Sequence, residues 1–115
     1  MKEPELIYLA GPYSQDPDAM FKQHMRHAAL LMAQSIQVFS PILHCHPVAG
    51  QYSMPTDFSF WEAYNLNMLK RCDKLYVMDI PGWDKSTGVK GEIFYARQLD
   101  IPVYLYNTNG TVKEL

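Results

Sequence analysis

This sequence contains little cysteine, no long apolar run and no stretch that resembles a secretion signal. The 115 residues include only two cysteines, Cys45 and Cys72, and neither stands in the CxxC or CxxH spacing of a metal site. No apolar stretch follows a basic segment at the N-terminus, as a signal peptide requires, and no run approaches the roughly 20 apolar residues of a membrane span. We therefore expect a reduced, cytoplasmic protein with no membrane partner.

Positive charge is also scarce. Ten Lys and Arg residues stand against 12 Asp and Glu, which gives a net charge of −2, and the basic residues are scattered along the chain. Binding to a nucleic-acid polymer requires a clustered basic surface, so we exclude that class of partner. Hydrophobic residues make up 48% of the chain and charged residues 19%, which is typical of a folded globular protein. This length predicts a single domain over residues 1–115.

Short apolar runs alternate with segments of helical period. The apolar run at 6–10 ends at a glycine and a proline, and a long amphipathic helix follows from Asp16 and Pro17. Further strands are expected at 38–40, 75–80 and 101–106, and further helices at about 59–71 and after Ser86. Residues 42–56 contain two prolines and a glycine without a clear period, so we expect a long loop there, either a substrate wall or disordered. The order predicts an α/β fold: a small, open, doubly wound parallel sheet of about four or five strands with helices on both faces.

The first two of the expected helices each have a stripe of apolar residues. In the second helix Ser59 and Glu62 have the spacing of a capping box. Asn65 lies on the stripe four residues after Trp61, so its amide should point inward and need a polar partner or a ligand. The stripe of the first helix comprises Phe21, Met25, Ala28, Met32 and Ile36, and that of the second comprises Trp61, Tyr64, Met68 and Cys72.

A turn-rich loop and a helix form the segment from Pro81 to Leu99. Ser86 stands at the expected N-cap, and Gly88 would let the backbone approach a ligand. Glu92 shares a helix face with Val89 and Ala96, so it should face the sheet. Near a helix N-terminus the dipole favours a carboxylate while burial opposes it, which suits a poorly solvated nucleophile. The simpler interpretation is an acid that only complements the helix dipole.

The order and spacing of several short motifs resemble the nucleoside 2-deoxyribosyltransferase superfamily, which includes the 2'-deoxynucleoside 5'-phosphate N-glycosidases. The resemblance is closest to an uncharacterised bacterial and phage branch and spans nearly the whole chain. It implies a flavodoxin-like or Rossmann-like fold. The motifs are AGPYS at 10–14, SP-x-x-H at 40–44, the FW pair at 60–61, the PGW turn at 81–83 and SxGVxxE at 86–92.

The resemblance implies an enzyme that cleaves or exchanges the N-glycosidic bond of a nucleoside or nucleotide. Glu92 would be the nucleophile, Asn65 a second catalytic residue, and no cofactor or metal would be needed. Ser86 and the loop after the first strand would hold the sugar hydroxyl or the 5'-phosphate, and either Tyr8 or Tyr13 would orient the carboxylate or line the base pocket. The expected substrate-binding residues are Tyr8, Gly11, Pro12, Tyr13, Ser14, His44, Trp83, Ser86 and Gly88.

Two positions depart from the family pattern. Family members usually have an Asp eight residues before the Asp that opens the next strand, and counting back from Asp73 gives Asn65. A general-acid role would then pass to Asp57, Glu62 or Asp84. The loop after the first strand also has no basic residue to hold a phosphate. A nucleotide-binding module or sensor that has lost turnover is therefore the alternative function.

Two further features are open to two interpretations, and the size of the chain bears on its assembly. His44 and His46 flank Cys45, but without a distant matching pair of ligands we favour substrate-loop or structural roles over a metal site. Trp83 would stack on a nucleobase or anchor its loop. The small size of the domain favours a homo-oligomer in which a neighbouring subunit closes the site.

Overall fold

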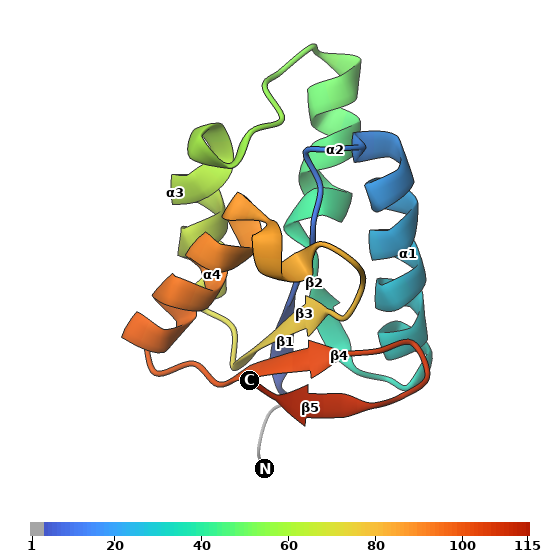
Figure 1. The fold of residues 1–115 in the computed structure, drawn as a ribbon, viewed down its shortest axis with the longest axis vertical. Helices are drawn as coiled ribbons and strands as arrows, with labels where there is room; N and C mark the ends of the chain where they lie inside the picture. The colour runs from blue at the N-terminus through green and yellow to red at the C-terminus, as the bar shows by residue number, and fades with distance from the viewer. Residues whose placement is uncertain (1–3) are drawn as a thin grey trace.

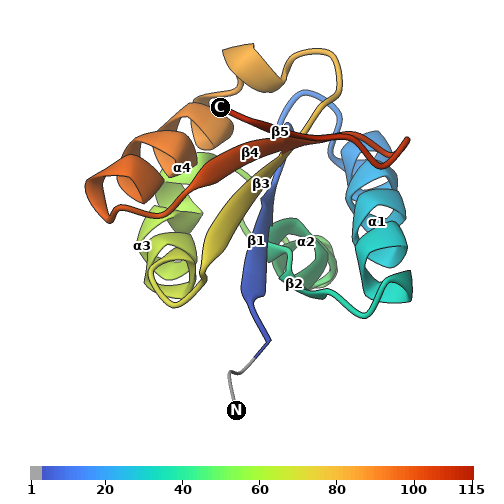
Figure 2. The same cartoon turned by 90° about the horizontal axis from the view of Figure 1, so that it is seen from below.

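The computed structural model describes residues 4–115, which form one five-stranded sheet with helices on both of its faces (Figures 1 and 2). The strand order is β2-β1-β3-β4-β5; the first four strands are parallel and β5 is antiparallel to β4. This confirms the expected α/β fold with an open, mostly parallel sheet. The strands are β1 (Leu6–Ala10), β2 (Gln37–Phe39), β3 (Lys74–Met78), β4 (Val103–Tyr106) and β5 (Val112–Glu114). The helices are α1 (Pro17–Ala33), α2 (Pro41–Gln51), α3 (Phe58–Leu69) and α4 (Thr87–Gln98), with a short 3-10 helix η1 (Trp83–Lys85).

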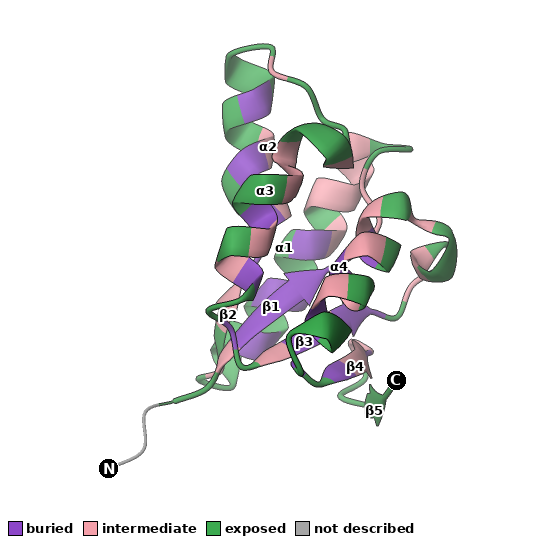
Figure 3. Ribbon diagram, turned by 90° about the vertical axis from the view of Figure 1, so that its left-hand side faces the viewer, coloured by how far each residue is buried: buried purple, intermediate pink, exposed green. Residues whose placement is uncertain are grey.

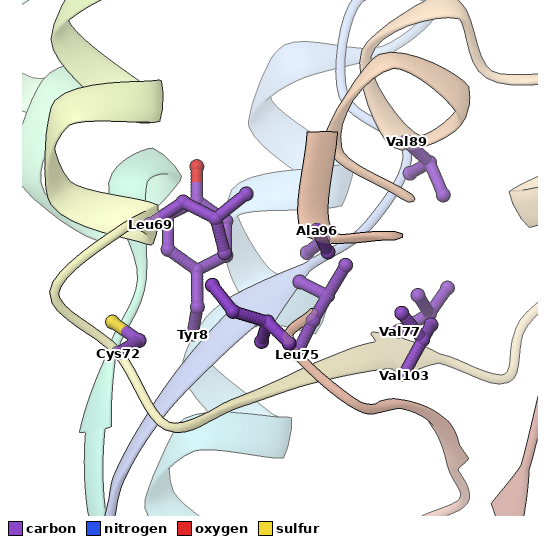
Figure 4. Close-up of a cluster of buried hydrophobic side chains, with 10 residues drawn as sticks. Tyr8, Leu69, Cys72, Leu75, Val77, Val89, Ala96 and Val103 are labelled. Atoms are coloured by element: carbon purple, nitrogen blue, oxygen red, sulfur yellow. The ribbon is translucent and has the colours of Figure 1, made fainter. Parts of the chain in front are cut away.

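Alternate residues of the strands serve two separate cores. Tyr8 and Ala10 of β1 point to one face, where they join buried residues of α3 and α4 such as Leu69 and Ala96 (Figure 4). Leu9 points to the other face and packs with Leu31 of α1. Each fully buried leucine contributes roughly 1.5–3 kcal/mol of transfer free energy. The sheet is therefore the central layer, with α3 and α4 on one side and α1 on the other (Figure 2).

Burial decreases from the centre of the sheet outward. Figure 3 shows β1 and β3 largely buried, the outer faces of the helices exposed, and β5 exposed along its length. Among residues 4–115, no helix combines the length and the apolar composition needed to cross a membrane.

The expected long loop is instead mostly helix. Residues 41–51 form α2, and only the segment after Gln51 is irregular. Ser40 is its N-cap, with the hydroxyl accepting a hydrogen bond from the Leu43 amide at 3.2 Å, and Pro41 occupies the first turn, where no amide donor is needed. Pro47 lies inside the helix. A proline there and the absence of a regular apolar spacing around it made the segment look like a loop. A second difference is β5, which pairs with β4 although no strand was expected after residue 106.

Helix faces and caps were also only partly predicted. In α1 the buried residues are His24, His27, Ala28 and Leu31, whereas Met25 and Met32 are exposed, so the expected stripe was one position out of phase. The histidines can be buried because each places a ring nitrogen near a backbone carbonyl, 3.2 Å for His24 and 2.7 Å for His27. In α3 the expected capping box does not form, because Asp57 is the N-cap and the Ser59 hydroxyl donates to the Asp57 carboxylate instead.

Candidate active site

A cavity of about 360 Å³ opens where β1 ends and α4 begins. Gly11, Tyr13 and Ser14 form one wall, α2 a second, and the first turn of α3 with Asn65 a third. Ser86, Gly88 and Glu92 complete the lining from α4. This is the carboxyl end of the central strands, where open α/β sheets bind ligands.

Glu92 is the buried acid of this cavity. Its side chain is 5% exposed, lines the cavity, and accepts a hydrogen bond on Oε2 from the Tyr8 hydroxyl. Burial raises the pKa of Glu92 to about 7, and the Tyr8 hydrogen bond partly opposes that rise. Tyr8 is fully buried, and burial followed by the nearby Glu92 charge raises its pKa well above 10.0, so the phenol keeps its proton.

The fold explains why Tyr8 rather than Tyr13 meets the carboxylate. Tyr8 projects from β1 toward α3 and α4, with its hydroxyl at the end away from the strand (Figure 4). The ring therefore fills the core beside Leu69 while the hydroxyl reaches the inner face of α4. Tyr13 lies in the loop after β1 and bonds elsewhere. Of the two tyrosines that the sequence left as candidates, Tyr8 is therefore the one that contacts Glu92.

Asn65 points into the cavity, in agreement with its place on the inner side of α3. It is 6% exposed, and its Oδ1 has no hydrogen-bond partner among the described residues. An unpaired buried amide oxygen costs free energy, about 1–3 kcal/mol, unless a ligand or water satisfies it. Asn65 is therefore arranged to accept or donate a hydrogen bond within the cavity.

The first turn of α4 provides backbone donors. The Ser86 side chain accepts a hydrogen bond from the Val89 amide at 3.3 Å and so caps the helix, as expected. Phe58 of α3 packs over this turn and the next. A Cβ added at Gly91 would lie 2.8 Å from the Phe58 ring, so the glycine allows α3 to approach α4 closely. Phe58 in turn lines the cavity.

The loop after β1 rests on a buried histidine. His24 is fully buried; its Nε2 lies 3.2 Å from the Pro12 carbonyl oxygen, while its Nδ1 has no partner among residues 4–115. Burial lowers the pKa of His24 to about 4, so the ring is neutral and can donate one hydrogen bond. A Cβ at Gly11 would lie 3.1 Å from the His24 ring and 2.4 Å from the Met78 methyl group. His24 therefore fixes the backbone that carries Tyr13.

A second set of polar side chains also reaches this cavity. The Tyr13 hydroxyl is 2.6 Å from His46 Nδ1, and His46 Nε2 is 3.2 Å from an Asp18 carboxylate oxygen. The Phe21 ring stacks on His46 with centroids 4.5 Å apart. Both Tyr13 and His46 line the cavity, whereas Asp18 is exposed.

Some expected substrate residues lie outside the cavity. His44 is exposed on α2, where its Nε2 lies 2.7 Å from the Tyr64 hydroxyl and the two rings stack. Trp83 is the first residue of η1 and packs half-buried against the core, which matches its interpretation as a loop anchor. Pro12 supports the loop through its carbonyl, and Tyr8 lies behind Glu92. The expectation that His44 and Trp83 line the site is corrected by these positions.

Several lining residues were not among the expected set. His46 was expected only as a substrate-loop or structural histidine, whereas His44 was counted among the substrate-binding residues. Both stand in one His-Cys-His run, and the helix turns them to different faces. Asp57 had been considered only as an alternative acid, and Trp61 as part of the apolar helix stripe and the FW pair. The remaining unexpected lining residues are Ala10, Pro41, Ile42, Cys45, Ala49, Thr56, Phe58, Ser59 and Thr87.

The ionisable lining is acidic. Glu92 and Asp57 are its carboxylates, and within residues 4–115 neither lysine nor arginine lines the cavity. A hydrogen bond from Ser59 lowers the pKa of Asp57, so this carboxylate is ionised. In the same part of the chain no group of three or more His, Cys, Asp or Glu side chains is arranged to hold a metal ion.

Solved structures similar to this chain include two 2-deoxyribosyltransferases. The 2-deoxyribosyltransferase from the psychrotolerant bacterium Bacillus psychrosaccharolyticus is 22% identical, with a TM-score of 0.56 over 89% of this chain and 72% of that one. The 2-deoxyribosyltransferase from Leishmania mexicana is 20% identical, with a TM-score of 0.58 over 90% of this chain and 65% of that one. The expected resemblance to this superfamily is thus confirmed at the level of the fold.

Comparison at the level of sequence gives a family. No curated protein matches the chain. A family described as "Domain of unknown function (DUF1937)" matches residues 5–108, which include every strand of the parallel part of the sheet and the whole cavity lining. Because the match extends over nearly the whole sequence, this chain belongs to the DUF1937 family.

Proposed function

We propose that this protein cleaves or exchanges the N-glycosidic bond of a deoxynucleoside through a covalent glycosyl intermediate on Glu92. The observation that carries the proposal is a buried carboxylate that faces a nucleoside-sized cavity and is held by a tyrosine hydroxyl. The two similar structures, both named 2-deoxyribosyltransferases, support it.

The proposed chemistry follows that of a retaining glycosidase. Tyr8 holds Oε2, which leaves the other carboxylate oxygen to attack the anomeric carbon. The bond to the base breaks as the ester to Glu92 forms, and the base leaves with the electron pair of that bond. Water or a second base then attacks the same carbon and releases Glu92. A pKa of about 7 leaves a substantial fraction of Glu92 ionised at neutral pH, in a site where poor solvation favours nucleophilic attack.

The lining favours a free nucleoside over its 5'-monophosphate. A bound phosphate needs cationic or backbone donors, and no lysine or arginine of residues 4–115 lines the cavity, so the backbone amides at the starts of α2, α3 and α4 would have to hold it. Asp57, an ionised carboxylate on the lining, would repel a phosphate. The polar side chains Ser14, Asn65 and Ser86 instead suit sugar hydroxyl groups.

A second candidate function is a nucleoside-binding module without turnover. The observation that favours it is Asn65, a residue that cannot exchange a proton at the position where the resemblance predicts an acid. A bound nucleoside could donate a hydrogen bond to the unpaired Oδ1 of Asn65 in either function.

One experiment separates the two candidates. The protein is incubated with each deoxynucleoside and deoxynucleoside monophosphate, and free base is measured; a 2-fluoro-2-deoxy nucleoside is used to trap an adduct for peptide mass spectrometry. The proposal predicts base release, which Glu92→Ala lowers at least 100-fold, and a glycosyl adduct on Glu92. The exposed Glu114→Gln variant is the control and should retain activity.

If no substrate releases base and no adduct forms on Glu92, the enzymatic proposal is wrong. Tight deoxynucleoside binding that survives Glu92→Ala without product would then support the binding module.

A further inference from the structure

Cleavage of an N-glycosidic bond needs a proton as well as a nucleophile. A nucleobase is a poor leaving group as an anion, and a positioned acid typically contributes about 10²–10⁴-fold to such a step. The side chain that delivers this proton has to reach the cavity and hold an exchangeable proton at neutral pH. The position expected to hold the acid is Asn65, which cannot supply it.

The other ionisable groups on the lining do not meet these requirements. Asp57 is held ionised by its hydrogen bond from Ser59 and has no proton to give. Burial raises the pKa of the Cys45 thiol to about 11, which makes it a weak acid. Glu92 is engaged as the nucleophile. The earlier alternatives Glu62 and Asp84 do not line the cavity.

The hydrogen-bonded side chains Asp18, His46 and Tyr13 have a geometry that meets both requirements. Both ring nitrogens of His46 are engaged, Nδ1 at 2.6 Å from the Tyr13 hydroxyl and Nε2 at 3.2 Å from the Asp18 carboxylate. When His46 is protonated, Nδ1–H donates to the Tyr13 oxygen, and the Tyr13 proton is free to point at a ligand. Tyr13 and His46 lie on the same cavity as Glu92. Stacking on Phe21 and the contact with Asp18 fix the ring.

We propose that His46, oriented by Asp18, protonates the departing base through Tyr13. This assignment rests on the proposed function and names the general acid for its first step. As Glu92 forms its bond to the anomeric carbon, the Tyr13 proton moves to a ring nitrogen of the base and the Nδ1 proton of His46 moves to Tyr13. The base leaves neutral with the electron pair of the broken bond, and His46 becomes neutral. When water resolves the ester, its proton returns to His46 by the same route.

The charges around His46 are consistent with this role. Asp18 from α1 is the carboxylate that faces it, and Tyr13 is the titratable group on the loop side. Cys45 is its neighbour along α2, and Asp57 and Glu92 lie on other walls of the same cavity. Burial, followed by the charge of Asp18, raises the pKa of Tyr13, so Tyr13 relays a proton without becoming a stable phenolate.

The test uses substrates that differ in their need for an acid. An N7-methylated purine base already has a positive charge and leaves as a neutral molecule, so 7-methyl-2'-deoxyguanosine requires no protonation. We expect His46→Gln and Tyr13→Phe each to lower kcat/KM for the unmodified deoxynucleosides by about 100-fold or more. Neither should lower it more than about fivefold for the methylated substrate. Added imidazole should restore base release in His46→Ala.

His44→Gln is the matched control, since His44 lies two residues away on the same helix and also bonds a tyrosine, but outside the cavity. It should leave both rates unchanged. Thermal unfolding of each variant checks that the fold is retained. A loss that is equal for both substrates, without imidazole rescue, would overturn the assignment to His46 and leave the proposed function intact. If the wild-type protein cleaves neither substrate, the proposed function itself fails.

Discussion

Glu92 illustrates how one residue is defined by both its position and its surroundings. Its spacing from Val89 and Ala96 indicates an inward side chain, and the structure confirms that all three are buried. The identity of its partner depends on β1, 84 residues earlier in the chain. Burial, which no local pattern measures, then raises its pKa to about 7.

The raised pKa predicts a pH-dependent cost to stability. The folded chain binds a proton at Glu92 more tightly than the unfolded chain, whose pKa is near 4.5. The stabilisation of the folded state by this proton is therefore fully present below pH 4.5 and is lost as the pH rises through about 7. Relative to the Glu92→Gln variant, the wild-type protein should lose on the order of 3 kcal/mol of unfolding free energy across this window.

Urea unfolding at intervals from pH 4.5 to pH 8 measures this difference. The buried histidines titrate in both proteins, so their effect cancels in the comparison. Glu114→Gln, at an exposed position, should follow the wild-type curve. Parallel curves for wild type and Glu92→Gln would show that Glu92 is not perturbed by the fold.

Among the elements, α2 was the one least visible in the sequence. Pro47 and Gly50 suggested a loop, yet the N-cap Ser40 and the first-turn Pro41 are a regular helix start. Because proline is tolerated in the first turn but not favoured further along, the two prolines have opposite meanings that composition alone does not separate. The helix turns His46 and Cys45 to the cavity and leaves His44 at the surface.

Packing of α3 against α4 gives a second prediction. Gly91→Ala adds a Cβ 2.8 Å from the Phe58 ring, whereas Gly50→Ala on α2 meets no atom within 4 Å. Replacing a helical glycine with alanine stabilises by up to about 1 kcal/mol where space allows. We expect Gly50→Ala to stabilise the protein and Gly91→Ala to destabilise it. In Gly91→Ala, Phe58 should also shift into the cavity and weaken deoxynucleoside binding. Denaturant unfolding and isothermal titration measure both effects, and equal gains for the two variants would contradict the close packing.

At the scale of the whole molecule, apolar side chains remain exposed on α2, α3 and α4. Tyr52 is 75% exposed at the end of α2, and Phe60 and Tyr64 on α3 are 48% and 45% exposed. We propose that the exposed aromatic side chains of α3 bind a second copy of the chain, which would form the expected homo-oligomer. Burial of such aromatic side chains is a major source of interface stability.

Light scattering should therefore show a dimer or larger assembly at micromolar concentration, and Phe60→Asp should dissociate it. Phe94→Asp on α4, where Phe94 is 56% exposed, is the matched control and should leave the assembly unchanged. A wild-type monomer would refute the proposal.

The sequence by itself determined the alternation of strands and helices, the cap at Ser86, and the inward positions of Asn65 and Glu92, because these depend on the local periods of 2 and 3.6 residues. The tertiary structure decided which groups meet: Tyr8 with Glu92, His46 with Tyr13, and His24 beneath the loop after β1. Such pairs join residues 12 to 84 positions apart, and their contact depends on the sheet order and on which helix face is buried. A local pattern has no information on either, so the sequence indicated an inward Glu92 and two candidate tyrosines beside it, whereas the choice of Tyr8 and the contact of His46 with Tyr13 came only from the tertiary structure.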